Sequence, residues 1–223
     1  MIYILPVFAV LISFVFVYLT KPKSQKSIKL LLAFSGAFLL ALTCFELLPE
    51  VYQSSKPKTV SFFILSGILL QIILESFSKG AEHGHLHHRS KNNSFPLILF
   101  LSLAIHALVE GLPISGENNI IYGILIHKLP VATVLSIFLL NSNLKIGYTL
   151  LFISLFAFMT PLGSLLATES SFIAFYSIEL SALAIGVFFH ISTVVLFESA
   201  QGHSFNLQKL IVILIGFGLA YFI

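Results

Sequence analysis

Apolar residues run through this chain in long blocks that polar segments interrupt. The blocks hold 18–27 residues, long enough for a helix of about 17–25 residues to cross the hydrocarbon core of a bilayer. The pattern predicts an all-α integral membrane protein with eight transmembrane helices, at residues 2–20, 29–49, 59–78, 95–115, 118–140, 146–168, 171–197 and 206–223.

The polar segments between the blocks are mostly short, as at residues 21–27, 53–58 and 141–143. The longer connection, at residues 79–94, contains four histidines: His83, His85, His87 and His88. The first block lacks the basic leader of a cleavable signal peptide, so we expect it to be retained as a first transmembrane helix. We therefore predict one membrane domain, residues 1–223, with a histidine-rich loop at 79–94.

Composition indicates the same class of protein. Hydrophobic residues make up 57% of the chain and charged residues 9%, whereas soluble domains carry about 25% charged residues. So few charges cannot cover an ordinary water-facing surface. Cys44 is the one cysteine in the sequence, which excludes an internal disulfide and a cysteine-based metal cage.

Lysine and arginine are unevenly distributed over the connections. One set of alternate connections and their flanks holds Lys21, Lys23, Lys26, Lys29, Lys79, Arg89, Lys91, Lys145 and Lys209, and the other set holds Lys56 and Lys58. Because basic residues are retained on the cytoplasmic side, both termini are predicted to lie outside a plasma or inner membrane, with residues 79–94 in the cytoplasm. The formal net charge of +3 is therefore a topology signal and does not indicate nucleic acid as a partner.

Three ionisable residues stand inside two neighbouring blocks. His106 and Glu110 are four residues apart, on one face of a helix, and His127 lies in the next block. A charged group in hydrocarbon costs at least ~2.5 kcal/mol, so such residues persist mainly where they bind or conduct something. Two imidazoles and one carboxylate suit Zn²⁺ and also accept other first-row divalent ions. We predict that the three bind one metal ion; the alternative for His106 and Glu110 is a structural hydrogen-bonded pair.

The segments around these residues resemble motifs of the ZIP (Zrt-, Irt-like protein) family. Residues 106–111 resemble its signature of histidine, asparagine, two variable residues, acid and glycine, and residues 127–130 resemble its histidine, acid, any residue, proline motif. Supporting matches lie at residues 34–38, 47–50, 161–163 and 186–189. The resemblance covers nearly the whole chain. It implies a divalent metal transporter in which helices one to three and six to eight form inverted halves around helices four and five, and it implies a homodimer.

The sequence departs from the family where members build a second, adjacent metal position. Ala107 replaces the usual asparagine, Lys128 an acid, Thr160 a glutamate, and Val131 a metal-binding histidine or glutamate. One position, at His106, Glu110 and His127, therefore retains its ligands. We hypothesise that the ammonium of Lys128 substitutes for the second cation by balancing Glu110. The alternative is that Lys128 snorkels, but it lies roughly 15 Å from either end of its block.

Other polar residues are candidates for the path of an ion. Glu46 and Glu50 suit an entrance that attracts cations, or they are solvated at the interface. His190 is a candidate ligand along the path, or it bonds a neighbouring carbonyl, and Glu75 is expected to be interfacial. The loop histidines His83, His85, His87 and His88 suit weak metal capture at neutral pH, or they belong to a dispensable connector.

Together these features predict a carrier that moves a divalent cation toward the cytoplasm by alternating exposure of a midplane site. Zn²⁺ is the expected transported substrate, with other first-row divalent metals or Cd²⁺ as alternatives. An intramembrane metallohydrolase is a weaker alternative, because the zincin motif and aspartate are both absent from the sequence. A non-transporting relative that binds metal or signals is the other alternative, suggested by the lost ligands.

Overall fold

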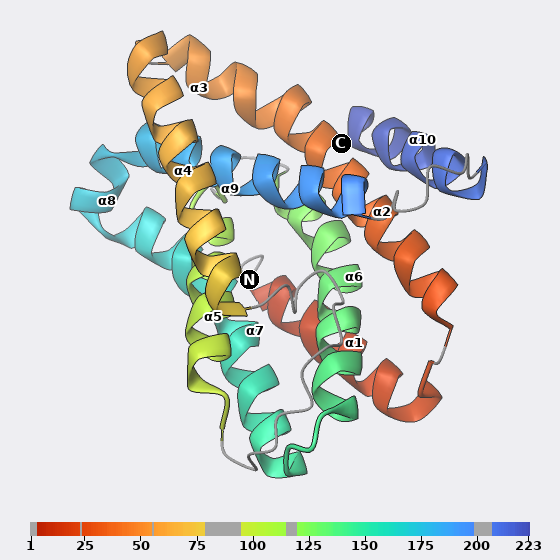
Figure 1. Cartoon of the computed structure of the whole chain (residues 1–223). Helices are drawn as coiled ribbons and strands as arrows, with labels where there is room; N and C mark the ends of the chain where they lie inside the picture. Colours follow the sequence, from red (N-terminus) through yellow and green to blue (C-terminus); the bar gives the residue numbers. More distant parts are fainter. Residues whose placement is uncertain (1–3, 23, 55, 79–94, 115–119, 199–206) are drawn as a thin grey trace.

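The computed structural model describes residues 4–22, 24–54, 56–78, 95–114, 120–198 and 207–223. These residues fold into helices, shown in chain order in Figure 1: α1 Leu5–Thr20, α2 Gln25–Leu42, the π-helix η2 Thr43–Leu47, α3 Leu48–Ser54, α4 Pro57–Ser78, α5 Leu97–Gly111, α6 Ile120–Asn141, α7 Ile146–Glu169, α8 Ser171–Phe175, α9 Ser177–Glu198 and α10 Leu207–Tyr221. The prediction of an all-α protein is confirmed for the described residues.

Helix boundaries follow the apolar blocks with two differences. Residues 171–197 do not form one helix, because α8 ends at Phe175 and α9 begins at Ser177. The hydroxyl of Ser170 caps α8 by accepting the backbone N–H of Ile173. The second difference is the π-helix that interrupts the second block.

The segments α2, η2 and α3 form one continuous rod, visible as the long orange helix in Figure 1. Within it, the N–H of Leu48 donates to the carbonyl of Thr43, the wider spacing of a π-helix. The Thr43 hydroxyl also donates to the Leu39 carbonyl at 2.7 Å. Single π-turns of this kind occur frequently at functional sites.

The described helices differ in length. Five candidate membrane spans are long and apolar enough to cross a bilayer, at Lys26–Gln53, Pro57–Ser78, Ile120–Asn141, Ile146–Glu169 and Ser177–Phe197. The helices α1, α5 and α10 are apolar but shorter. That all eight blocks cross the membrane stays a prediction.

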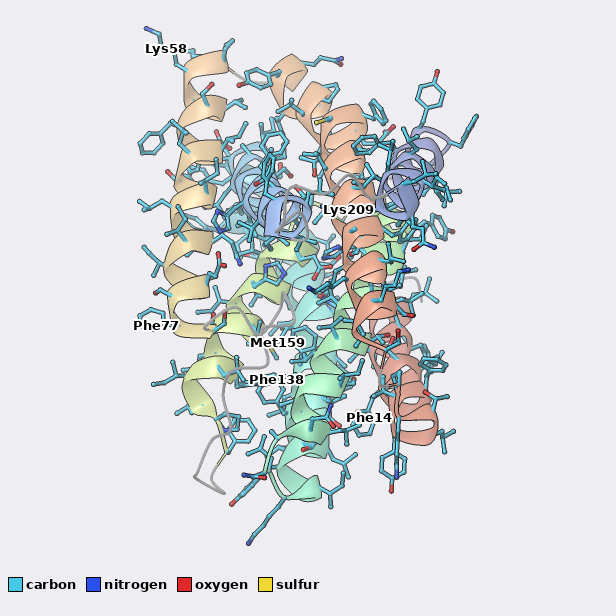
Figure 2. All side chains as sticks on the ribbon, turned by 45° about the vertical axis from the view of Figure 1, so that its right-hand side comes forward. Phe14, Lys58, Phe77, Phe138, Met159 and Lys209 are labelled. Atoms are coloured by element: carbon cyan, nitrogen blue, oxygen red, sulfur yellow. The ribbon has the colours of Figure 1, made fainter. Side chains whose placement is uncertain are left out.

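The outer surface of the bundle is apolar, as a bilayer requires. Along α4, Phe62, Leu65 and Leu69 are each more than half exposed. Figure 2 shows the side chains of this helix, between Lys58 and Phe77, projecting away from the other helices. A soluble monomer rarely exposes so large an apolar patch, so this face fits contact with lipid.

The described helices can be divided into two groups, which also contact each other extensively. One contains α1, α5, α6 and α7, and the other contains α2, α4, α9 and α10. The first group has its own core, in which Val10, Phe14, Leu103 and Phe152 pack together. The groups meet where α2 contacts α6 and where α5 contacts α4 and α9.

Two pairs of glycines bring helices within each group into backbone contact. A Cβ at Gly186 of α9 would lie 2.0 Å from the carbonyl oxygen of Ile64 in α4, and one at Gly67 would lie 2.0 Å from that of Leu183. Gly111 of α5 and Gly163 of α7 make the same kind of crossing. Small residues permit such close approach, which supplies van der Waals contact between membrane helices.

Candidate metal site

The predicted site residues come from two helices and are all deeply buried. His106 and Glu110 lie one turn apart on α5, and His127 and Lys128 are adjacent on α6. Their exposed fractions lie between 1% and 4%. Such burial of ionisable groups is tolerated only where each finds a partner.

Lys128 pairs with Glu110. Its Nζ donates to Glu110 Oε2 and, at 2.6 Å, to the hydroxyl of Thr160 on α7. That hydroxyl lies 3.4 Å from Glu110 Oε2, to which it donates, and the ring of Phe156 lies 5.0 Å from Nζ. A buried ion pair is tolerated when further hydrogen bonds satisfy it, and here α7 supplies them. The ammonium therefore points into the bundle, and Lys128 does not snorkel.

The second oxygen of Glu110 has a different environment. Within the described residues, Oε1 is buried and has no hydrogen-bond partner. Buried polar atoms are nearly always satisfied, so an exception calls for an explanation. Because Lys128 fixes Oε2, Oε1 is the atom that can accept a cation.

The two imidazoles line one small pocket between the helix groups. His106 and His127 share it with Ser35 and Gly36 of α2 and with Ile191 of α9. Its cavity has a volume of about 10 Å³, which is room for about one water molecule.

Ser35 orients His127. Its hydroxyl lies 2.8 Å from Nδ1 and 3.4 Å from the backbone carbonyl oxygen of His127. In the tautomer with the proton on Nδ1, the ring donates to Ser35, which donates to the carbonyl. The lone pair of Nε2 then stays available to a metal, the usual arrangement around ligating histidines.

The three predicted ligands do not converge on one point as a preformed metal-binding site would. Among the described residues, no three His, Cys, Asp or Glu side chains are arranged to hold one ion. Glu110 interacts electrostatically with both His106 and His127, but its nearest cation is Lys128. Joint coordination by His106, Glu110 and His127 stays a prediction.

The remaining candidates fall in three places. Glu46 lies in the π-helix η2 and Glu50 in α3, and both are exposed. His190 of α9 bonds Glu75 of α4, a partner that the sequence did not predict for either residue. The loop histidines His83, His85, His87 and His88 lie outside the described residues.

Three residues to which the sequence assigned no function contact the predicted site residues: Thr160, Phe156 and Ser35. The sequence identifies Thr160 only as a lost ligand, but its hydroxyl accepts a hydrogen bond from Lys128. Phe156 lies one turn before it on the same face of α7, a spacing that indicates a shared neighbour. Ser35 lies in the segment 34–38 that resembles a family motif, but nothing in its spacing shows that it meets His127.

Two comparisons place the chain among known proteins. The model of a family described as ZIP Zinc transporter matches residues 79–223, more than half of the chain. A protein of Danio rerio named Zinc transporter ZIP1 is 31% identical over 153 residues, which cover 61% of this chain and 49% of that protein. The match thus spans about half the length of this relative. The family match contains both motif segments, and both comparisons point to the same kind of protein.

Proposed function

This chain belongs to the ZIP zinc transporter family, and from that premise we propose that it carries Zn²⁺ across a membrane through a single site between α5 and α6. Membership makes it a multi-pass membrane protein and a transporter relative rather than an enzyme, as the sequence predicted. Other first-row divalent ions and Cd²⁺ are the alternative substrates.

One observation supports this site most directly: the buried Oε1 of Glu110 without a hydrogen-bond partner among the described residues. It lies on the turn after His106, and His106 shares a pocket with His127. Two imidazole nitrogens and a carboxylate oxygen form a ligand set common for zinc. The charge of Glu110 is already balanced by Lys128, so the two imidazole nitrogens dominate the binding of the metal. Nitrogen ligands favour late first-row metals over Mg²⁺ and Ca²⁺.

In this proposal the ammonium of Lys128 substitutes for a second metal ion. Its ammonium holds Glu110 Oε2 and Thr160, and the resemblance puts both Lys128 and Thr160 at positions where family members have acids. A fixed positive charge there excludes a second metal by repulsion.

Replacing Lys128 with aspartate should raise the metal content. Lys128→Asp removes the fixed charge and adds a carboxylate beside Glu110, so we expect purified protein to bind close to two zinc ions per chain instead of one. Elemental analysis of the desalted protein measures the ratio, with Ser136→Ala on the same helix as the control. An unchanged ratio in a well-folded variant contradicts the role given to Lys128.

The proposed membrane arrangement follows the sequence predictions. Eight helices span the membrane in an inverted 3+2+3 arrangement, with both termini outside and residues 79–94 in the cytoplasm, and the protein forms a homodimer. The pocket of His106 and His127 lies where the two helix groups meet. A relative movement of the groups would open it first to one side and then to the other, which is alternating access. Transport is inward in this proposal.

Zinc uptake by reconstituted vesicles tests the function. Wild-type protein should accumulate Zn²⁺, and His127→Ala should lower the initial rate by about tenfold or more, since it removes a ligand. Ser136→Ala is the matched control, because Ser136 is buried on the same helix and, among the residues that the structure describes, bonds the Ala132 carbonyl of its own helix. Tight zinc binding without uptake would instead support the non-transporting relative, and undiminished uptake by His127→Ala would reject the site.

A further inference from the structure

Outside the central pocket, an imidazole and a carboxylate join α4 to α9. His190 Nε2 lies 2.6 Å from Glu75 Oε2. The two side chains are 15% and 24% exposed, so this pair is less enclosed than the central residues. The pair links positions 115 residues apart.

The pair lies close to the central pocket, on one particular side of it. Ser102 of α5 donates to the carbonyl of Leu74, the residue before Glu75, at 2.5 Å. His106 follows Ser102 by one helical turn, about 6 Å along the axis. On α9, the residue after His190 is Ile191, which lines the pocket of His106 and His127.

This side of the pocket is the one that leads to residues 79–94. The helix α4 ends at Ser78, three residues after Glu75, and α5 begins at Leu97, before Ser102. Glu75 and His190 therefore stand between the central pocket and the ends of the helices that residues 79–94 connect.

The bond between Glu75 and His190 is not needed to hold α4 against α9. These helices already cross in backbone contact at Gly67 and Gly186. The chemistry of the pair suits an ion, because imidazole nitrogen and carboxylate oxygen are both zinc ligands. Ligand atoms on a tetrahedral Zn²⁺ stand about 3.3 Å apart, so the two atoms need to separate by less than 1 Å.

We propose that Glu75 and His190 form a second, transient metal-binding position, through which the ion passes between the central pocket and the side of residues 79–94. With two protein ligands the position binds weakly and water completes the coordination. This inference rests on the proposed transport function, and it assigns a role to a pair that the central site does not use.

Uptake measurements separate a metal ligand from a structural ion pair. His190→Lys keeps an opposite charge for Glu75 but removes the ligand, and the double variant Glu75→Gln with His190→Gln keeps a hydrogen-bonding pair. We expect both to lower initial Zn²⁺ uptake by about tenfold, with the melting temperature and the zinc content of the central site unchanged. Ser76→Ala, next to Glu75, is the control. Wild-type uptake by His190→Lys would overturn the proposal.

A thiol protection assay tests metal binding independently of transport. Cys44→Ser removes the one cysteine of the chain, and Glu75→Cys then adds a single thiol beside His190. Cd²⁺ should slow alkylation of this thiol by N-ethylmaleimide, and adding His190→Ala should raise the half-protecting Cd²⁺ concentration by about tenfold. Equal protection with and without His190 would overturn the proposal. If wild-type vesicles take up no zinc, the proposed function fails, whereas this assay still decides whether the pair binds metal.

Discussion

Replacing Glu110 with glutamine will destabilise the protein by about 3–5 kcal/mol, the cost of breaking a buried ion pair from one side. Lys128 is 1% exposed. The amide oxygen of glutamine can still accept from its ammonium, as the Thr160 hydroxyl does, but among the residues described here the buried positive charge would have no opposite charge beside it. Lys128→Met should have a similar cost, because it leaves the carboxylate of Glu110 without its cation. Unfolding in a mixed-detergent titration measures both.

The double variant tests whether the pair is the cause. Glu110→Gln with Lys128→Met removes both charges, so we expect most of the stability to return, while zinc binding stays lost because the carboxylate ligand is gone. If Glu110→Gln and Lys128→Met are each as stable as wild type, then Glu110 and Lys128 do not form a buried ion pair.

Replacing Gly186 with alanine will be nearly as damaging, at about 3 kcal/mol, the upper part of the usual range for overpacking. The added Cβ would lie 2.0 Å from a carbonyl oxygen of α4, and backbone cannot move aside as a flexible side chain does. The helices α4 and α9 must therefore separate. Size-exclusion chromatography and the melting temperature report the loss of folded protein.

Gly218→Ala is the matched control for this substitution. Gly218 lies in α10, and within the described residues no neighbouring helix comes within 4 Å of an added Cβ, so alanine there should leave stability unchanged or raise it slightly. If Gly186→Ala melts at the same temperature as Gly218→Ala, the close crossing of α4 and α9 is wrong.

The helices were predictable from the sequence because a bilayer imposes a length on every apolar segment. The interruptions were not. The π-turn at Thr43–Leu47, where the Thr43 hydroxyl bonds the Leu39 carbonyl, and the break between α8 and α9 are local backbone features that no apolar pattern encodes.

The candidate site was predictable as a set of residues but not as a set of contacts. The burial of Lys128 and its balancing of Glu110 followed from a charge far from both ends of an apolar block. The partners contributed by other helices did not follow. Ser35 meets His127 across 92 positions and Glu75 meets His190 across 115, and a single sequence carries no signal that pairs residues so far apart.

The same limit applies to the central metal position. Spacing placed His106 and Glu110 on one face of a helix, but it could not show that Lys128 occupies one carboxylate oxygen and leaves the other for an ion. We therefore propose a ligand set of two imidazoles and the single oxygen Oε1 of Glu110, because Lys128 holds Oε2.

X-ray absorption at the zinc edge of the zinc-loaded wild-type protein measures the ligands of the bound ion. We expect one zinc per chain with two imidazole nitrogens at about 2.0–2.1 Å and a carboxylate oxygen, and the loss of one imidazole in His127→Ala. A zinc shell without imidazole, or a spectrum that His127→Ala leaves unchanged, would contradict the proposed site.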